Sequence, residues 1–161
     1  MKKRLYIAYG SNLNVSQMKQ RCPDARIVGT TELRGFELLY KGSKSGAYLT
    51  IEHKKGGVVP VALWEVSAAD ERRLDIYEGF PDFYYKRDIR LTYRDQAGEA
   101  HKAQAFVYIM HEERRLGIPH WSYIGTCKQG YAYFGFDDKY LDEAYKRSWK
   151  GAMKYERAEQ S

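Results

Sequence analysis

The sequence predicts a mixed α+β fold, in which a small sheet curled toward a barrel is flanked by helices. The chain has 161 residues, of which 43% are hydrophobic and 15% aromatic, enough to bury a core without disulfides or metals. Strand-like segments bounded by glycine-bearing turns alternate with helical patterns. No internal repeat or linker interrupts them, so we expect one domain over residues 1–154 and a frayed tail over 155–161.

The first predicted element is a strand that leads into a loop and a short helix. Residues 5–9 are rich in β-prone side chains, and the Gly-Ser-Asn run at 10–12 ends the strand. Residues 15–21 then indicate a helix, for which either Asn14 or Ser16 can serve as the N-terminal cap. The loop therefore lies between a strand and a helix.

Three further strands are expected next along the chain. Residues 26–41, 47–53 and 58–66 are rich in β-branched, leucine and aromatic side chains. Glycine-bearing segments at 42–46 and 56–57 separate them, and such segments are typical of turns. The pattern predicts strands that meander in antiparallel order.

A helix is predicted to follow Ser67. This residue and Asp70, three positions later, have the spacing of an N-terminal cap followed by an acidic first turn. Leu74 and Glu78 are four residues apart and share a face, so Glu78 falls in the last turn on the apolar side. Gly79 comes directly after it and is expected to end the helix.

The rest of the domain is predicted to form a hairpin and two helices. Residues 84–93 and 102–110 alternate well enough to pair as strands across a turn at Gly98. Residues 122–134 and 138–150 have helical periodicity.

The charge pattern predicts neither nucleic acid nor a membrane as a partner. Lys and Arg number 27 against 21 Asp and Glu, a formal charge of +6, but they are scattered and form no basic stripe. The excess is typical of a solvated surface, and it would also suit an acidic ligand. No run of 18 apolar residues is present that would span a membrane.

The cysteines and histidines indicate neither a disulfide framework nor a metal site. Cys22 and Cys127 are far apart and belong to no CxxC pair. The four histidines lack the spacing of metal ligands. With no signal-peptide pattern, these features predict a cytoplasmic protein that needs no metal or other cofactor.

Residues 9–13, Tyr-Gly-Ser-Asn-Leu, form the first candidate site. Glycine permits close backbone approach, and successive N–H groups ahead of a helix can bind a carboxylate or an oxyanion. The same Gly-Ser-Asn run is also ordinary turn chemistry. The loop alone therefore leaves both interpretations open.

Glu78 is the second candidate. Aromatic residues at 77, 80 and 83–85 would partly desolvate its carboxylate, which would raise the pKa toward neutrality and suit a general base. The alternative is an exposed glutamate at a helix end. That alternative is not favoured by the helix dipole, because a negative charge at a C-terminus is destabilising without compensation.

Tyr123 is the third candidate, within the segment Pro-His-Trp-Ser-Tyr at 119–123. Its hydroxyl could donate a hydrogen bond into a pocket. A core or surface position is the commoner role for one of 15 tyrosines, so this residue proves nothing by itself.

Taken together, three motifs carry a family resemblance. They are Tyr-Gly-Ser-Asn-Leu at 9–13, Tyr-Glu-Gly at 77–79, and Pro-x-x-x-Tyr at 119–123 with Gln-Gly-Tyr at 129–131. In this order and spacing the chain resembles the γ-glutamylcyclotransferase-like family, which includes plant avirulence-induced-protein-like proteins and γ-glutamylamine cyclotransferases. The resemblance covers residues 5–135 and implies the family's fold, a small β-barrel with one cavity where the motifs converge.

The resemblance also implies a reaction. Family members release an amine or amino acid from a γ-glutamyl group when the glutamyl α-amine attacks its own γ-carbonyl, which yields 5-oxoproline without a cofactor. Glu78 would deprotonate the α-ammonium group and then protonate the leaving amine. The residues expected to bind substrate are Tyr6, Tyr9, Gly10, Ser11, Asn12, Leu13 and Tyr123.

Two alternatives stay open at this point. The same cavity could belong to a non-catalytic module that binds a small acidic metabolite. Nucleic-acid binding by a basic, aromatic-rich barrel is disfavoured, because no RNP-like motif occurs. The γ-glutamyl compound that serves as substrate is undetermined, as is the choice between monomer and homodimer.

Overall fold

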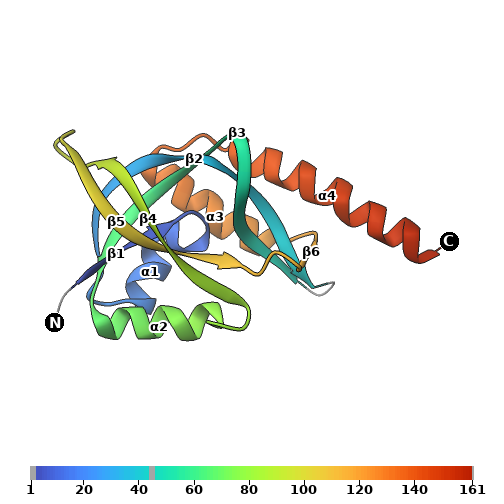
Figure 1. Ribbon diagram of the computed structural model, residues 1–161, viewed down its shortest axis with the longest axis horizontal. Coiled ribbons are helices and arrows are strands. Elements are labelled where there is room, and N and C mark those ends of the chain that lie inside the picture. Colours follow the sequence, from blue (N-terminus) through green and yellow to red (C-terminus); the bar gives the residue numbers. More distant parts are fainter. Residues whose placement is uncertain (1–2, 44–45, 161) are drawn as a thin grey trace.

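The computed structural model describes residues 3–43 and 46–160, and it has the predicted α+β class (Figure 1). One six-stranded sheet carries the fold, with helices packed around it. The strands are β1 (Arg4–Ala8), β2 (Arg26–Ser43), β3 (Gly46–Val66), β4 (Tyr84–Arg94), β5 (Ala100–Met110) and β6 (Arg115–Leu116). The helices are η1 (Ser11–Leu13, a 3-10 turn), α1 (Val15–Arg21), α2 (Ala68–Glu78), α3 (Trp121–Phe134) and α4 (Lys139–Gln160).

The sheet closes into a barrel. Its strand order is β3-β1-β5-β4-β2-β6, and β2 also pairs with β3, so five strands form a ring and β6 extends it. β1 runs parallel to β5, and the other pairings are antiparallel. The β2–β4 seam rests on the pair Thr30 and Arg94. Gly29 permits this contact, because a Cβ there would lie 2.2 Å from the Arg94 carbonyl oxygen.

The prediction of two strands over 47–53 and 58–66 was wrong, because β3 is continuous from Gly46 to Val66. The chain does not reverse at residues 56–57. Instead the register against β2 shifts between the pairs Phe36–His53 and Arg34–Val58. Four residues of β3 therefore lie opposite one residue of β2, and the glycines serve a bulge rather than a turn. Of the turn predicted at 42–46, residues 44–45 lie outside the described part.

The other predicted strands and helices, except the last helix, match the structure to within two residues at each end. The central strands are buried on both faces: every residue from 105 to 110 is buried, because one face points into the barrel and the other lies beneath other elements. Side chains that fill this core include Ile7, Trp64 and Phe106. No helix in the described ranges has the length and apolar composition that spanning a membrane requires.

α4 is longer than expected and extends away from the barrel (Figure 1). Residues 155–160, predicted to fray, are helical, whereas Ser161 lies outside the described residues. Arg115 explains part of this extension. Its guanidinium pairs with Glu159 at 2.6 Å and stacks over the Tyr155 ring at 5.0 Å.

Candidate functional site

A cavity of about 370 Å³ opens where the loop after β1, the end of α2 and the start of α3 meet. Strands β1, β3, β4 and β5 supply its remaining walls. All the residues predicted for the site line this cavity except Leu13. The described lining residues are Tyr6, Tyr9, Gly10, Ser11, Asn12, Tyr48, Leu49, Ile76, Tyr77, Glu78, Gly79, Phe83, Tyr84, Tyr108 and Tyr123.

The loop after β1 is a buried turn with little room. Ser11 to Leu13 form η1, in which every residue is buried. A Cβ on Gly10 would lie 3.3 Å from Leu49 Cδ1 and 3.4 Å from the Tyr123 hydroxyl, so a larger residue would require these side chains to shift slightly. Asn14 then caps α1, accepting a hydrogen bond from the Gln17 amide at 3.2 Å, so one of the two predicted caps is used.

Leu13 does not face the cavity. Its side chain is fully buried beneath α3, and a Cβ on Gly130 would lie 2.5 Å from the Leu13 carbonyl carbon. This contact lets α3 pack directly on the loop. Leu13 therefore anchors the loop from behind.

The Asn12 carboxamide is held at both ends. Its Nδ2 donates to the Tyr6 hydroxyl at 2.9 Å, and its Oδ1 accepts a hydrogen bond from Nη1 of Arg21. Ser11 Oγ lies 3.3 Å from the Tyr77 hydroxyl. The loop is thus tied to β1, to α1 and to the end of α2.

Glu78 is the last residue of α2, and it lines this cavity. Burial raises its pKa to about 7, and the positive charge of Arg21 partly opposes that shift. No described group donates a hydrogen bond to the carboxylate, so nothing else holds it ionised. A carboxyl with this pKa can both accept and release a proton near neutral pH.

Local sequence fixes where α2 begins and ends. Ser67 caps the helix by accepting a hydrogen bond from the Asp70 amide at 3.1 Å. Gly79 ends it in the left-handed conformation, with φ of 64°. Glu78 is therefore held in the final turn, as predicted.

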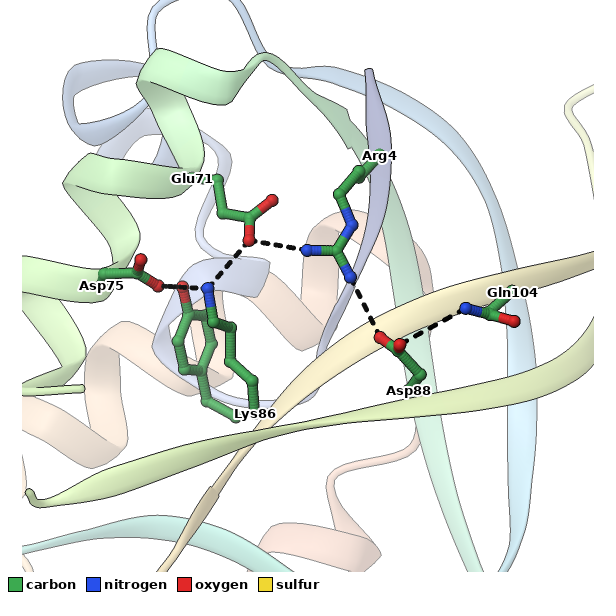
Figure 2. Close-up of polar contacts among 7 residues, drawn as sticks. Arg4, Glu71, Asp75, Lys86, Asp88 and Gln104 are labelled. Atoms are coloured by element: carbon green, nitrogen blue, oxygen red, sulfur yellow. Dashed lines mark hydrogen bonds and ion pairs between the residues drawn. The ribbon is translucent and has the colours of Figure 1, made fainter. Parts of the chain in front are cut away.

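A network of charges fixes α2 against the sheet (Figure 2). Lys86 of β4 contacts Glu71 at 2.8 Å and Asp75 at 2.9 Å, both on α2. Arg4 of β1 joins Glu71, at 2.7 Å, to Asp88, at 3.0 Å. Because Lys86 and Glu71 are mostly buried, these contacts are less screened than surface pairs and orient the helix that carries Glu78.

The network reaches the cavity through Tyr108. Its hydroxyl donates to Asp75 at 2.6 Å, while its ring lines the cavity. Asp75 precedes Glu78 by about one helical turn. The cavity wall and the turn that carries Glu78 are therefore held by the same contact.

Three tyrosines use their hydroxyls to fix the cavity walls. Tyr9 donates to the Tyr108 carbonyl oxygen at 2.7 Å, and Tyr84 donates to the Leu49 carbonyl oxygen at 2.9 Å. The Tyr123 hydroxyl accepts from the Leu49 amide at 3.0 Å. Its own hydrogen can be donated in turn, and the buried Cys127 side chain is one hydrogen-bond partner within reach.

Sequence reasoning missed several lining residues. Tyr48, Leu49 and Tyr108 come from the long strands β3 and β5, where no local motif sets them apart from other core positions. Phe83 and Tyr84 were expected near Glu78 only as aromatic neighbours. Alternation along a strand predicts which face a residue takes, but not which part of that face borders a cavity.

The comparisons with known proteins agree on the fold. Residues 6–124 match the family model described as "Gamma-glutamyl cyclotransferase, AIG2-like". A search of curated proteins found no match. An uncharacterized protein from Homo sapiens has a similar structure, with a TM-score of 0.73 and 23% identity over 89% of this chain and 87% of the other.

Two further structures are similar. One, solved as a gamma-glutamyl cyclotransferase, has a TM-score of 0.71 and 24% identity over 89% of this chain and 86% of the other. YkqA from Bacillus subtilis has a TM-score of 0.68 and 16% identity, covering 92% of this chain but 55% of its own. The matched family model spans most of the chain and all of the lining residues from Tyr6 to Tyr123, so the chain belongs to the gamma-glutamyl cyclotransferase, AIG2-like family.

Proposed function

We propose that this protein is a γ-glutamylcyclotransferase that releases 5-oxoproline and a free amine from a γ-glutamyl amide. The observation that supports it best is the convergence of Glu78, with its pKa raised to about 7, and the Gly10–Asn12 loop on one cavity. Ring closure within one substrate needs a folded, positioned substrate and proton transfer rather than a protein nucleophile. The site supplies groups for both.

Glu78 acts as the proton carrier in this proposal. The ionised carboxylate takes a proton from the substrate α-ammonium group, and the freed amine attacks the γ-carbonyl carbon. A new C–N bond closes the five-membered ring and the C–N bond to the leaving amine breaks. Glu78 gives its proton to the leaving nitrogen, takes the second proton that the ring nitrogen must lose to become an amide, and passes it to the released amine, which departs as an ammonium ion. No water is consumed and the carboxylate is regenerated.

The loop holds the glutamyl end of the substrate. The first N–H groups of η1 have no acceptor within the helix, so they can donate to a carboxylate or to the developing oxyanion. A carboxamide nitrogen carries two hydrogens, and Asn12 donates one of them to Tyr6. The second is available to the substrate.

The charge of the cavity lining also indicates which leaving amine the site prefers. Glu78 is the one formally charged side chain among the described lining residues, which include no Lys, Arg or His. A carboxylate on the leaving amine would be desolvated there without a counter-ion, and Glu78 would repel it. The formal charge of +6 is therefore not concentrated on the cavity, and the preferred substrates are γ-glutamyl amides whose released amine carries no carboxylate.

A matched substrate panel tests this proposal. Pairs of γ-glutamyl amides that differ only in a carboxylate on the released amine are incubated with the full chain, and 5-oxoproline is measured. We expect release from at least one compound and a kcat/KM about tenfold or more higher for the member without the carboxylate. Thermal stabilisation by these compounds with no 5-oxoproline, even at high protein concentration, would instead favour a binding module.

A further inference from the structure

Arg21 lies behind the cavity, at the junction of three elements that position the site. It is the last residue of α1 and is partly buried. Its guanidinium stacks on the Tyr77 ring, with Cζ 3.6 Å from the ring centroid. Tyr77 directly precedes Glu78 and its ring forms part of the cavity wall, so Arg21 supports that wall from outside.

The same guanidinium donates two hydrogen bonds. One goes from Nη1 to Asn12 Oδ1, and the other from Nη2 to Gln17 Oε1 at 3.1 Å. The hydrogen bond to Asn12 Oδ1 sets the orientation of the carboxamide, so that its nitrogen points toward the Tyr6 hydroxyl. A planar fork that stacks and donates at once is a property of arginine and not of lysine.

Arg21 is also the cation that acts on Glu78. Burial alone would favour the protonated carboxyl, and the guanidinium acts against that preference. The other titratable groups that interact with Glu78 come from β1, the following loop, β4 and β5. They are Tyr6, Tyr9, Tyr84 and Tyr108, whose pKa values are raised by burial and which are neutral at pH 7.

We propose that Arg21 is a positioning residue of this site, which joins the Asn12 carboxamide to the end of α2 and keeps Glu78 able to accept a proton. This inference rests on the proposed function. Arg21 itself does not line the cavity and is not expected to touch the substrate. It acts through Asn12, Tyr77 and Glu78.

Replacing Arg21 with methionine tests the electrostatic part. Without the guanidinium we expect the pKa of Glu78 to rise by about one unit, at the low end of the effect of a nearby opposite charge. At pH 7 the ionised fraction then falls from about one half to about one tenth, which lowers kcat/KM about fivefold beyond the loss caused by the missing hydrogen bond to Asn12. At pH 9 both proteins are ionised, so this additional loss nearly disappears and only the loss from the missing hydrogen bond remains.

A lysine in place of Arg21 separates charge from geometry. Arg21→Lys keeps the charge but cannot stack and donate as a fork, so we expect the pH midpoint of the parent and a KM about fivefold higher, the effect of one lost hydrogen bond. Arg72→Met, on the exposed face of α2, serves as the matched control and should leave kcat and KM unchanged.

Direct titration of the Glu78 carboxyl by ¹³C NMR in the free protein completes the test. It needs no substrate, so it gives a result even if the panel of γ-glutamyl amides yields no 5-oxoproline. An unchanged Glu78 pKa in Arg21→Met, or a kcat/KM lowered by the same factor at pH 6 and pH 9, would overturn the proposal. If Arg21→Met does not fold, Arg21→Gln takes its place with the same expected shift.

Discussion

At the scale of single residues, the site combines a desolvated carboxyl with neutral partners. Glu78 stands in a wall of tyrosines, and one partly buried arginine offsets part of the desolvation that raises its pKa to about 7. The residues at 9–12 and at 78 each have a chemical reason to lie in a site, but singly they left a structural role open, and only their order with Tyr123 pointed to one cavity. Arg21 was not predictable, because a basic residue at the end of a helix is common for reasons of the helix dipole alone.

Glu78 makes stability depend on pH. Its pKa is about 7 in the folded protein against an ordinary value of 4.5, so the folded state binds more protons between those values. Stability should therefore fall as pH rises from 4.5 through 7, and then level off. We expect Glu78→Gln to be more stable than the parent at pH 8 by about 3 kcal/mol, and the two to converge below pH 4.

Urea denaturation of the two proteins at pH 4 and pH 8 measures this difference. Glu113→Gln, an exposed glutamate, is the control and should follow the parent at both pH values. A Glu78→Gln variant that is less stable than the parent at pH 8 would mean that the carboxylate makes stabilising contacts.

At the scale of elements, helix ends were easier to predict than strand ends. The caps of α2 are local: a serine three residues before Asp70 and a glycine after Glu78 determine them. The continuity of β3 is not local, because the glycines at 56–57 suit a turn as well as a bulge, and pairing with β2 decides between them. Likewise the last turns of α4 contact Arg115, which is distant in sequence, and no local pattern predicts such a contact.

The contact between α3 and the loop gives a prediction at this scale. Gly130→Ala places a methyl group 2.5 to 2.7 Å from Leu13 atoms, and the backbone is among them, so α3 or the loop must shift. We expect a loss of about 1 to 3 kcal/mol in the free energy of unfolding, together with a raised KM. Gly125→Ala is the matched control, because that glycine is also in α3 but has nothing within 4 Å of the added Cβ.

Thermal and chemical unfolding of both variants distinguish the two positions. Gly125→Ala should be neutral or stabilising by up to about 1 kcal/mol, since alanine is the better helix former. Equal behaviour of the two variants would show that the close packing of Gly130 on Leu13 does not hold the loop in place.

At the scale of the whole molecule, closure of the barrel creates the cavity. Tyr6, Leu49 and Tyr108 come from three strands far apart in the chain. Tyr6 and Tyr108 meet because β1 pairs with β5, and Leu49 joins them where its carbonyl oxygen accepts a hydrogen bond from Tyr84. The α+β class followed from the sequence pattern. The order of the three motifs indicated that they converge on one cavity. The full lining could not be predicted, because strand register and barrel closure depend on pairings that no single segment encodes.

The central claim is that Glu78 carries the proton, and the pH dependence of activity tests it. kcat/KM for 5-oxoproline release is measured between pH 5 and pH 9 with the panel substrate that reacts best, for the parent and for Glu78→Gln. Because the base must be ionised, parent activity should rise with a midpoint near pH 7, and Glu78→Gln should lose on the order of 100-fold or more and show no such midpoint. A Glu78→Gln variant that keeps the parent rate, or the same midpoint, would contradict the assignment of Glu78 as the proton carrier.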